Sequence, residues 1–423
     1  MSKAQVTKAI LTCSYNDSGP GLEQKIRDDY QREKAAGKTS LNHLILRNIH
    51  SGYDSLKFNL LLGGAPLFLY TLYTMHRSGI EQAAVVGNQE TGKITKAFCE
   101  QLRIKGFEFV HEGKPEEWSL SNTLRRGKSR LKPSEGELIL VCPGDTPFIS
   151  MEGLVDNPYA TGYDFIAPFN NKQNSGGFYP RNFHYVLVDE QGQEYPAKEA
   201  TAMLINFPKL DKNRFGEELY DKAFGARKSY DQGNPQQKFI AELFLKENGK
   251  FSLQRAKKAL SIVGIRQSVK EISRYLSKRV KGEGENEHNA PHMSIKSLEG
   301  LIEHAFGIPD FHVKIYPAPD PAAMLDIDSY EDLVFAESML QQAENPSEIY
   351  PYYDELKTFC KGQGSFGCDF PERWHKYANA QFHKYSIKAS YTSDGHLDQK
   401  VFPSSKIKGE IGLIKEFHGR KEE

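Results

Sequence analysis

The feature that most constrains the fold is a regular alternation of apolar runs and helix-like segments over the first 150 residues. Short apolar runs typical of strands lie at 8–13, 82–86, 107–111 and 138–142. Segments of helical composition stand between them, at 67–78, 91–103 and 121–132. Strands separated by single helices are typical of βαβ units, whose strands run parallel. The sequence therefore predicts an α/β fold with a mostly parallel central sheet flanked by helices.

The loops at the carboxyl ends of these strands are where we expect chemistry. In open parallel sheets, ligands bind in the crevice outside the carboxyl ends of the strands. The loops that follow Cys13, Val86 and Cys142 are therefore the first candidates for a functional site.

The charge balance disfavours one class of partner. The chain has 55 Lys plus Arg and 55 Asp plus Glu, so its formal net charge is zero. A protein that coats nucleic acid usually carries a basic excess, which replaces counterions. We therefore expect no nucleic-acid partner, although local charged patches are compatible with a neutral total.

Apolar patterning and cysteine usage bear on location. The longest apolar stretch, 59–75, is interrupted by two glycines and a proline and is too short to span a bilayer. The N-terminus shows no apolar secretory segment. The five cysteines form no CxxC pair, which fits a reducing compartment. The sequence predicts a cytoplasmic protein without a membrane span and leaves the oligomeric state open.

The strongest motif is the segment V-C-P-G-D-T-P-F, in which an apolar strand leads into a turn that carries Asp145. Magnesium prefers hard oxygen ligands, usually one or two carboxylates together with substrate phosphates and water. Asp145 stands where such a ligand would stand. The alternative is an aspartate that only stabilises the turn through its own backbone.

A second acidic motif lies far along the chain, at L-D-I-D-S-Y-E-D-L. If 324–327 forms a strand, Asp326 and Asp328 share one face and one of them completes a metal site with Asp145. The alternative is that Asp328 or Ser329 caps the following helix, and the two roles are compatible.

Two further elements offer groups for a phosphate or a base. Lys57 begins an apolar run that ends at Gly63-Gly64, and a lysine there could neutralise phosphate charge. Ser121 and Asn122 stand at a helix start and offer hydroxyl, amide and backbone N–H donors. The alternatives are a solvated lysine and an ordinary helix cap.

Taken together and in this order, these segments resemble the MobA-like NTP transferases, which belong to the nucleotidyltransferase superfamily with the GT-A-like fold. The family element K-x-L-L-P-L-x-G-x-P-L is matched by 57–67, and its G-D-x-P strand end is matched by 144–147. The D-I-D-T-P-E-D-L-like element is matched by 326–333. The resemblance covers roughly 5–170 and 310–340.

The resemblance implies metal-dependent transfer of a nucleoside monophosphate from an NTP to a phosphorylated acceptor, with release of pyrophosphate. It implies Mg²⁺ (or Mn²⁺) at Asp145 with Asp328 or Asp326, and catalytic roles for Asp145 and Lys57. It implies a nucleotide site at a set of loop residues: Ser14, Gly19, Gly21, Gly87, Ser121 and Asn122.

The chain departs from the family in its first loop. The family has a G-x-G-x-R-M loop directly after the first strand, whereas this chain has S-Y-N-D-S-G-P-G and about forty further residues before Lys57. Gly19 and Gly21 could present backbone to phosphate, but the usual arginine is missing from its place.

The resemblance also suggests a domain organisation. Residues 1–170 form the nucleotide-binding half, with an insert at about 14–55, and 171–343 form the acceptor-binding half, with a helical insertion at about 235–305. A C-terminal extension spans 344–423. Candidates for binding an anionic acceptor lie in the second half: Asn206, Arg227 and Lys228.

Two other functions remain open. A GT-A glycosyltransferase would use a preformed nucleotide sugar with a similar carboxylate–metal arrangement. A non-catalytic protein on the same fold would bind nucleotide or a partner through its long insertions.

Overall fold

The computed structural model describes the residues 6–14, 56–114, 117, 119–171, 185–198, 200–211, 246–247, 250–254, 257, 261–262, 292–327, 330–361 and 404–419. Within these ranges, no helix combines the length and the apolar character that crossing a bilayer requires.

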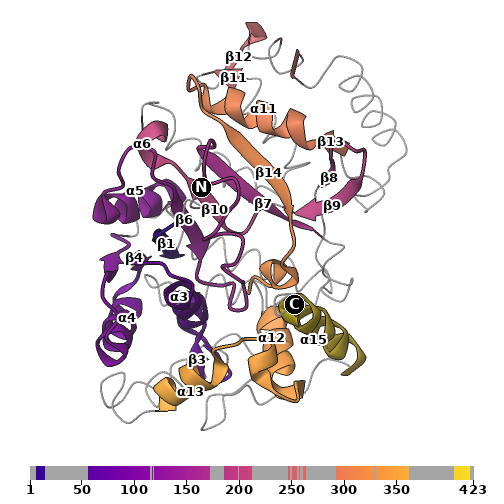
Figure 1. Ribbon diagram of the computed structural model, residues 1–423. Helices are drawn as coiled ribbons and strands as arrows, with labels where there is room; N and C mark the ends of the chain where they lie inside the picture. Colours follow the sequence, from indigo (N-terminus) through magenta and orange to yellow (C-terminus); the bar gives the residue numbers. More distant parts are fainter. Residues whose placement is uncertain are drawn as a thin grey trace, which may run out of the picture.

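The centre of the molecule is the parallel sheet that the sequence predicts (Figure 1). Strand β1 (Lys8–Cys13) pairs in parallel with β4 (Gln82–Gly87) on one side and with β6 (Ile139–Pro143) on the other. Strand β5 (Phe107–His111) pairs in parallel with β4 and ends that side of the sheet. The predicted bounds of all four strands agree with the structure to within a residue.

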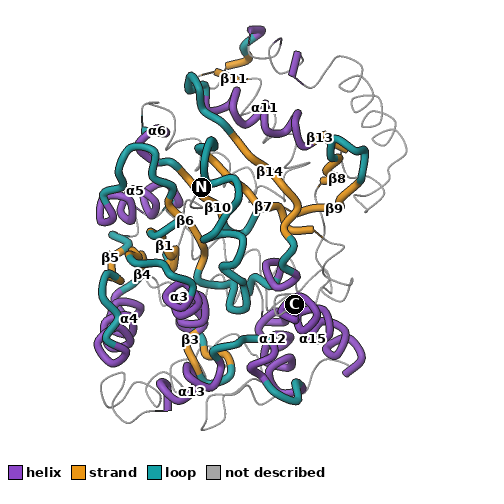
Figure 2. The backbone as a smooth tube through the Cα atoms, viewed as in Figure 1, coloured by secondary structure: helices purple, strands orange, loops and turns teal. Residues whose placement is uncertain are grey.

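The other half of the ten-stranded sheet is mixed (Figure 2). The short strand β10 (Met203–Ile205) runs antiparallel between β6 and β7 (Phe165–Asn171), and β14 (Val313–Ala318) runs parallel to β7. Beyond β7 follow three strands: β9 (Glu194–Lys198), β8 (Tyr185–Val188) and β13 (His292–Ser294). The fold is therefore mixed α/β, and mostly parallel at its core.

Side chains of β1 alternate between two hydrophobic cores, one on each face of the sheet. Ala9, Leu11 and Cys13 join the core that includes α3 (Leu67–Arg77) and α4 (Gln89–Leu102). Ile10 joins the core on the other face, with three further helices: α5 (Leu120–Leu131), α6 (Phe207–Leu210) and α11 (Ile295–Phe306). This alternation is the period of two expected for a strand covered on both faces.

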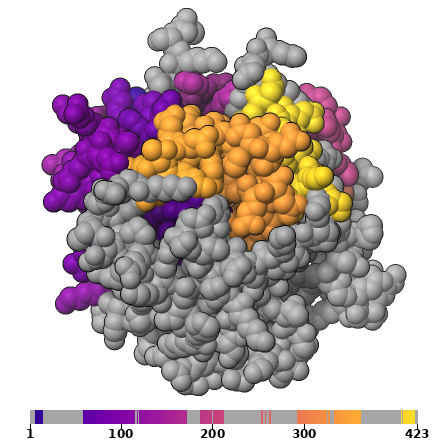
Figure 3. Space-filling model, turned by 90° about the horizontal axis from the view of Figure 1, so that it is seen from below, coloured from indigo at the N-terminus to yellow at the C-terminus, as the bar shows by residue number. Residues whose placement is uncertain are grey.

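The C-terminal helices close the first of these cores. Helices α12 (Tyr330–Gln342) and α13 (Tyr353–Lys361), with the short turns η7 (Pro321–Met324) and η8 (Pro346–Glu348), lead to α15 (Ser404–Gly419), which packs on α12. In Figure 3 the surface of α12 and α13 lies between the N-terminal half and α15. Tyr350, Phe359 and Ile414 are buried in the core that also contains Leu11 and Cys13 of β1.

The Gly63-Gly64 turn serves this packing. It joins β2 (Leu61–Leu62) to β3 (Ala65–Pro66), after the short helix η1 (Leu56–Asn59). Gly63 has φ +55°, and its N–H donates to Oε2 of Glu337 on α12 at 2.8 Å. The turn thus docks on α12. A further two-stranded piece, β11 (Lys246–Glu247) with β12 (Lys250–Phe251), stands apart from the main sheet.

Candidate functional site

Four parallel strands end together at one edge of the sheet. Cys13 at the end of β1 lies opposite Gly87 of β4, and Thr12 lies opposite Pro143 of β6. Gly87 lies opposite His111 at the end of β5. Four polar residues that follow these strands, none more than 8% exposed, therefore gather at this edge: Ser14, Asn88, Glu112 and Asp145. This is the edge at which such sheets bind ligands.

The turn after β6 holds Asp145 close to the end of β1. The N–H of Gly144 donates to the carbonyl oxygen of Thr12 at 3.0 Å. A Cβ on Gly144 would lie 2.6 Å from Sγ of Cys13 and 3.0 Å from Cβ of Phe68, so the position requires glycine. The G-D pair thus has a steric reason: the glycine lets the turn approach β1, and the aspartate follows at the sheet edge.

The second acidic motif meets this turn. The N–H of Ile327 donates to the carbonyl oxygen of Asp145 at 2.8 Å. Asp326 is buried, and its carboxylate oxygens lie 3.2 and 3.3 Å from Nζ of the buried Lys198 at the end of β9. The structure therefore brings together the two motifs that were predicted to meet. It also places Lys198 beside them, a residue that was not predicted from the sequence.

The strand considered at 324–327 does not form. Strand β14 ends at Ala318, η7 covers 321–324, and 325–327 are irregular. Prolines at 317, 319 and 321 remove backbone donors, and Asp320 caps η7 by accepting a hydrogen bond from the N–H of Ala322 at 2.9 Å. The period of two therefore does not apply to Asp326 and Asp328, and Asp328 lies outside the described residues.

Asn88 is a site residue that the sequence analysis missed. Its Oδ1 caps α4, accepting from the N–H of Thr91 at 2.8 Å, and also accepts from Nδ2 of Asn59 at 3.3 Å. Its Nδ2 is buried and has no hydrogen-bond partner in the described part of the chain. Buried polar groups are rarely left unpaired. The signal in the sequence was an asparagine directly between a predicted strand and a predicted helix.

Ser14 and Gly87, both predicted to bind nucleotide, have structural roles at this edge. The Ser14 hydroxyl donates to the carbonyl oxygen of Val86 at 3.2 Å and so ties β1 to β4. A Cβ on Gly87 would lie 3.1 Å from Cγ2 of Thr91 and 3.2 Å from Cys13. Gly87 therefore lets α4 start close to the sheet. Gly19 and Gly21 lie outside the described residues.

Helix α5 starts at Leu120, one residue before the predicted start at 121. The cap is Ser119, whose Oγ accepts from the N–H of Asn122 at 3.1 Å, while Ser121 lies inside the first turn with its Oγ 3.1 Å from Oγ of Ser119. The side-chain Nδ2 of Asn122 donates to the carbonyl oxygen of Glu117 at 2.6 Å. Both predicted nucleotide-binding residues therefore lie at the amino end of α5, as expected.

The electrostatics of the edge favour a cation. Burial raises the pKa of the Cys13 thiol well above its ordinary value, and the nearby carboxylates of Asp145 and Glu112 raise it further. Among the described residues, no three His, Cys, Asp or Glu side chains are grouped to hold a metal. Magnesium often needs only one or two protein carboxylates, because substrate phosphates and water complete its shell. Asp145 lies buried at this edge, and Asp326 is paired with Lys198.

The remaining predicted residues are not gathered here. Asn206 follows β10, and because Ile205 pairs with Ile139 it lies beside the amino end of β6, away from Asp145. Its Oδ1 caps α6 and its Nδ2 donates to Asp164 at 2.8 Å, so the structure shows a local role for it, and acceptor binding stays a prediction. The backbone of Lys57 lies in η1, and its side chain is not described. Arg227 and Lys228 lie outside the described residues.

Comparisons with known proteins give no family. No family model and no curated protein sequence matches the chain. A hypothetical transferase structure from Thermus thermophilus overlaps 78% of this chain and 99% of its own, with 15% identity and a TM-score of 0.37. The inositol-1-phosphate CTP transferase from T. maritima overlaps 49% of this chain and 73% of its own, with 13% identity and a TM-score of 0.31. The function is therefore argued from the site itself.

Proposed function

We propose that this protein is a nucleotidyltransferase that moves a nucleoside monophosphate from an NTP to a phosphorylated small molecule. An oxygen of the acceptor phosphate forms a bond to the α-phosphorus of the NTP. The bond from that phosphorus to the oxygen bridging to the β-phosphorus breaks, and pyrophosphate leaves with the electron pair. In such a reaction the protein mainly positions the two substrates and supplies positive charge around the phosphate oxygens.

The observation that carries this proposal is the junction between the turn after β6 and the segment 325–327. Ile327 is hydrogen-bonded to Asp145 across it at 2.8 Å, and the buried Lys198–Asp326 pair lies beside it. The junction thus combines a carboxylate suited to a cation with a buried ammonium suited to phosphate oxygens. A substrate phosphate that took over the Lys198 ammonium would release the Asp326 carboxylate for the cation.

We propose Mg²⁺ or Mn²⁺ as the cofactor, held by Asp145 with Asp326 or Asp328 as the second carboxylate. When bound, the ion supplies positive charge that offsets the oxygens around phosphorus. Asp145 positions the ion, and Lys57 and Lys198 hold phosphate oxygens.

The nucleoside would lie along the starts of α4 and α5. Asn88 offers an unused Nδ2 donor at the amino end of α4, a helix of 14 residues. Backbone N–H groups at such an end favour anions. Ser121 and Asn122 lie at the start of α5, on the other face of the sheet, and their hydroxyl and amide groups would contact the nucleoside from that side.

The decisive experiment screens each NTP against a panel of phosphorylated acceptors, with Mg²⁺, and measures pyrophosphate. Asp145→Asn should lower the rate about 100-fold or more, because it weakens the ion's site. Asp156→Asn is the matched control, since Asp156 is an exposed aspartate in a turn of the same connection after β6. Thermal unfolding of both variants checks that they fold.

Each other outcome identifies a different function. Release of a nucleoside diphosphate from a nucleotide sugar would indicate the glycosyltransferase. Nucleotide binding that is independent of Mg²⁺ and gives no pyrophosphate would indicate the non-catalytic binder. A folded Asp145→Asn variant with normal turnover would show that Asp145 does not hold the ion.

A further inference from the structure

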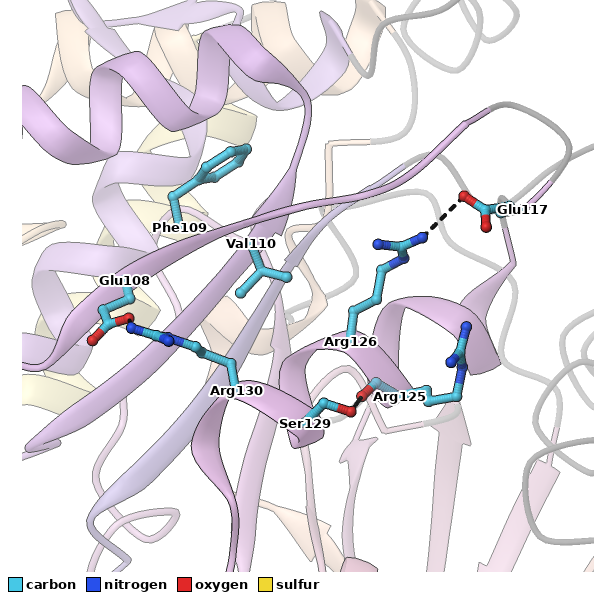
Figure 4. Close-up of a pocket in the computed structure, with 8 residues that line it drawn as sticks. All are labelled: Glu108, Phe109, Val110, Glu117, Arg125, Arg126, Ser129 and Arg130. Atoms are coloured by element: carbon cyan, nitrogen blue, oxygen red, sulfur yellow. Dashed lines mark hydrogen bonds and ion pairs between the residues drawn. The ribbon is translucent and has the colours of Figure 1, made fainter.

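A second polar hollow lies on the outer side of α5, against the edge strand β5. It is open to solvent, has a volume of about 680 Å³ and is lined by eight residues: Glu108, Phe109, Val110, Glu117, Arg125, Arg126, Ser129 and Arg130. Figure 4 shows Arg126 and Arg130 reaching from α5 toward Glu117 and Glu108, while Phe109 points away from them. Three arginines thus face two carboxylates, and the hollow carries an excess of positive charge.

The arginine at its centre is only partly satisfied. Nη2 of Arg126 donates to Oε2 of Glu117 at 2.9 Å, and its Nη1 makes a long contact of 3.4 Å with the carbonyl oxygen of His111. Its Nε has no hydrogen-bond partner in the described part of the chain. Nε and Nη2 form one side of the guanidinium, which matches a pair of phosphate or carboxylate oxygens. Glu117 therefore fills half of this fork.

The Glu117 carboxylate pairs with Arg126, and a bound anion could take its place there. The same Oε2 that contacts Arg126 also accepts from the N–H of Lys114 at 2.9 Å, so one oxygen serves both donors. The Glu117 side chain is 46% exposed and can swing into solvent. Arg125 contacts the side chain of Asn122 and has no carboxylate partner among the described residues. The hollow thus holds Arg126, whose Nε is unpaired, and Arg125, which forms no ion pair with any residue that the structure describes.

We propose that this hollow binds the phosphate group of a small phosphorylated molecule. One pair of phosphate oxygens takes the Nε–Nη2 side of Arg126 in place of Glu117, and the third oxygen faces Arg125. Two planar guanidinium groups suit a phosphate better than a carboxylate, because a phosphate has a further oxygen to share. The size of the hollow is in the range of small-molecule sites. This site lies apart from the Asp145 turn but adjoins the start of α5, because Arg125 contacts the side chain of Asn122. Phosphate binding without NTP or metal tests it separately from the transferase activity.

The test is a titration of the full chain with inorganic phosphate, by calorimetry without divalent metal and at constant ionic strength set with chloride. Arg126→Lys keeps the charge but removes the fork, so phosphate affinity should fall about tenfold. Arg77→Lys is the matched control, because Arg77 also pairs with an exposed glutamate, Glu355 at 2.8 Å, outside the hollow. It should bind phosphate as the wild type does.

Hydrogen exchange on the wild type gives a measurement that needs no variant. Phosphate should slow exchange of the amides at 108–114 and 120–131, and leave α15 unchanged. Three results would each overturn the proposal: no saturable binding by the wild type, equal weakening in both variants, or unchanged affinity in a folded Arg126→Lys protein. Absence of slowed exchange around the hollow would do the same.

Discussion

The backbone N–H of Ile327 donates a hydrogen bond to the carbonyl oxygen of Asp145 at 2.8 Å. This bond joins the turn after β6 to the segment after η7. It also brings the Asp326–Lys198 pair, from the mixed half of the sheet, to the edge formed by the parallel half. The two halves of the sheet therefore meet at the candidate site.

The buried pair of Lys198 and Asp326 should respond to mutation as a unit. Lys198→Met leaves a buried carboxylate without its partner, and should lower the free energy of unfolding by about 3–5 kcal/mol. The double variant Lys198→Met/Asp326→Asn removes both charges and should regain much of that loss. Lys93→Met, which breaks an exposed pair with Glu90, should cost about 1 kcal/mol or less. Urea denaturation measures all three, and a double variant no more stable than Lys198→Met would refute the coupling.

Much of this architecture follows from the sequence, for physical reasons. The strands predicted to end at Cys13, Val86 and Cys142 were predictable because parallel strands buried on both faces are continuously apolar and are bounded by helices. The meeting of Asp145 with Asp326 was a hypothesis that rested on the carboxylates of the two motifs and on a family resemblance, because spacing along the chain gives no distance between remote segments.

The features of the candidate site that were not predicted from the sequence depend on tertiary contacts. The ion pair between Lys198 and Asp326 forms because β9 ends beside the segment 325–327. No local sequence pattern predicts a contact between these two distant segments. Asn206 was a candidate for binding the acceptor, and the antiparallel direction of β10 carries it to the edge of the sheet opposite Asp145. The free Nδ2 of Asn88 appears only once the partners of its Oδ1 are known.

Replacing Asn88 should separate helix capping from ligand binding. Asn88→Asp keeps the Oδ1 acceptor that caps α4, but it places a carboxylate at a position that is 2% exposed, so the free energy of unfolding should fall by about 1–3 kcal/mol. The change removes the Nδ2 donor and adds negative charge, so NTP affinity should fall about tenfold or more. Asn345→Asp, at the cap of η8, is the matched control and should bind NTP normally. Equal affinities in the two variants would exclude Asn88 from the nucleotide site.

The buried thiols should be unreactive in the native state. Burial raises the pKa of Cys99 to about 11 and that of Cys142 to about 12, and it raises the pKa of Cys13 as well. Thiolates are the reactive species, so maleimide labelling of these residues at pH 7.5 should be far slower than in urea. Peptide mass spectrometry measures each position. Labelling of Cys13 at equal rates in both conditions would contradict its burial.

These shifts also predict a loss of stability in alkali. The unfolded thiols ionise near their ordinary pKa of 9.0, whereas the folded Cys142 holds its proton to about pH 12. The contribution of the buried Cys142 thiol to the free energy of unfolding is therefore fully present below about pH 9. It declines as the pH rises toward 12. Cys142→Ala should show a shallower decline over this window in urea denaturation, and an unchanged slope would contradict the assignment.

Two helical glycines should give opposite results when replaced by alanine. A Cβ on Gly412 of α15 would meet nothing within 4 Å, so Gly412→Ala should raise the free energy of unfolding by about 0.5–1 kcal/mol, since alanine restricts the unfolded chain. A Cβ on Gly127 of α5 would lie 2.7 Å from Cγ2 of Ile10, a buried β-branched side chain that has little room to move. Gly127→Ala should therefore push α5 off the sheet and cost about 1–3 kcal/mol. Urea denaturation of both variants distinguishes the cases, and stabilisation by Gly127→Ala would mean that α5 does not pack on β1 as closely as described.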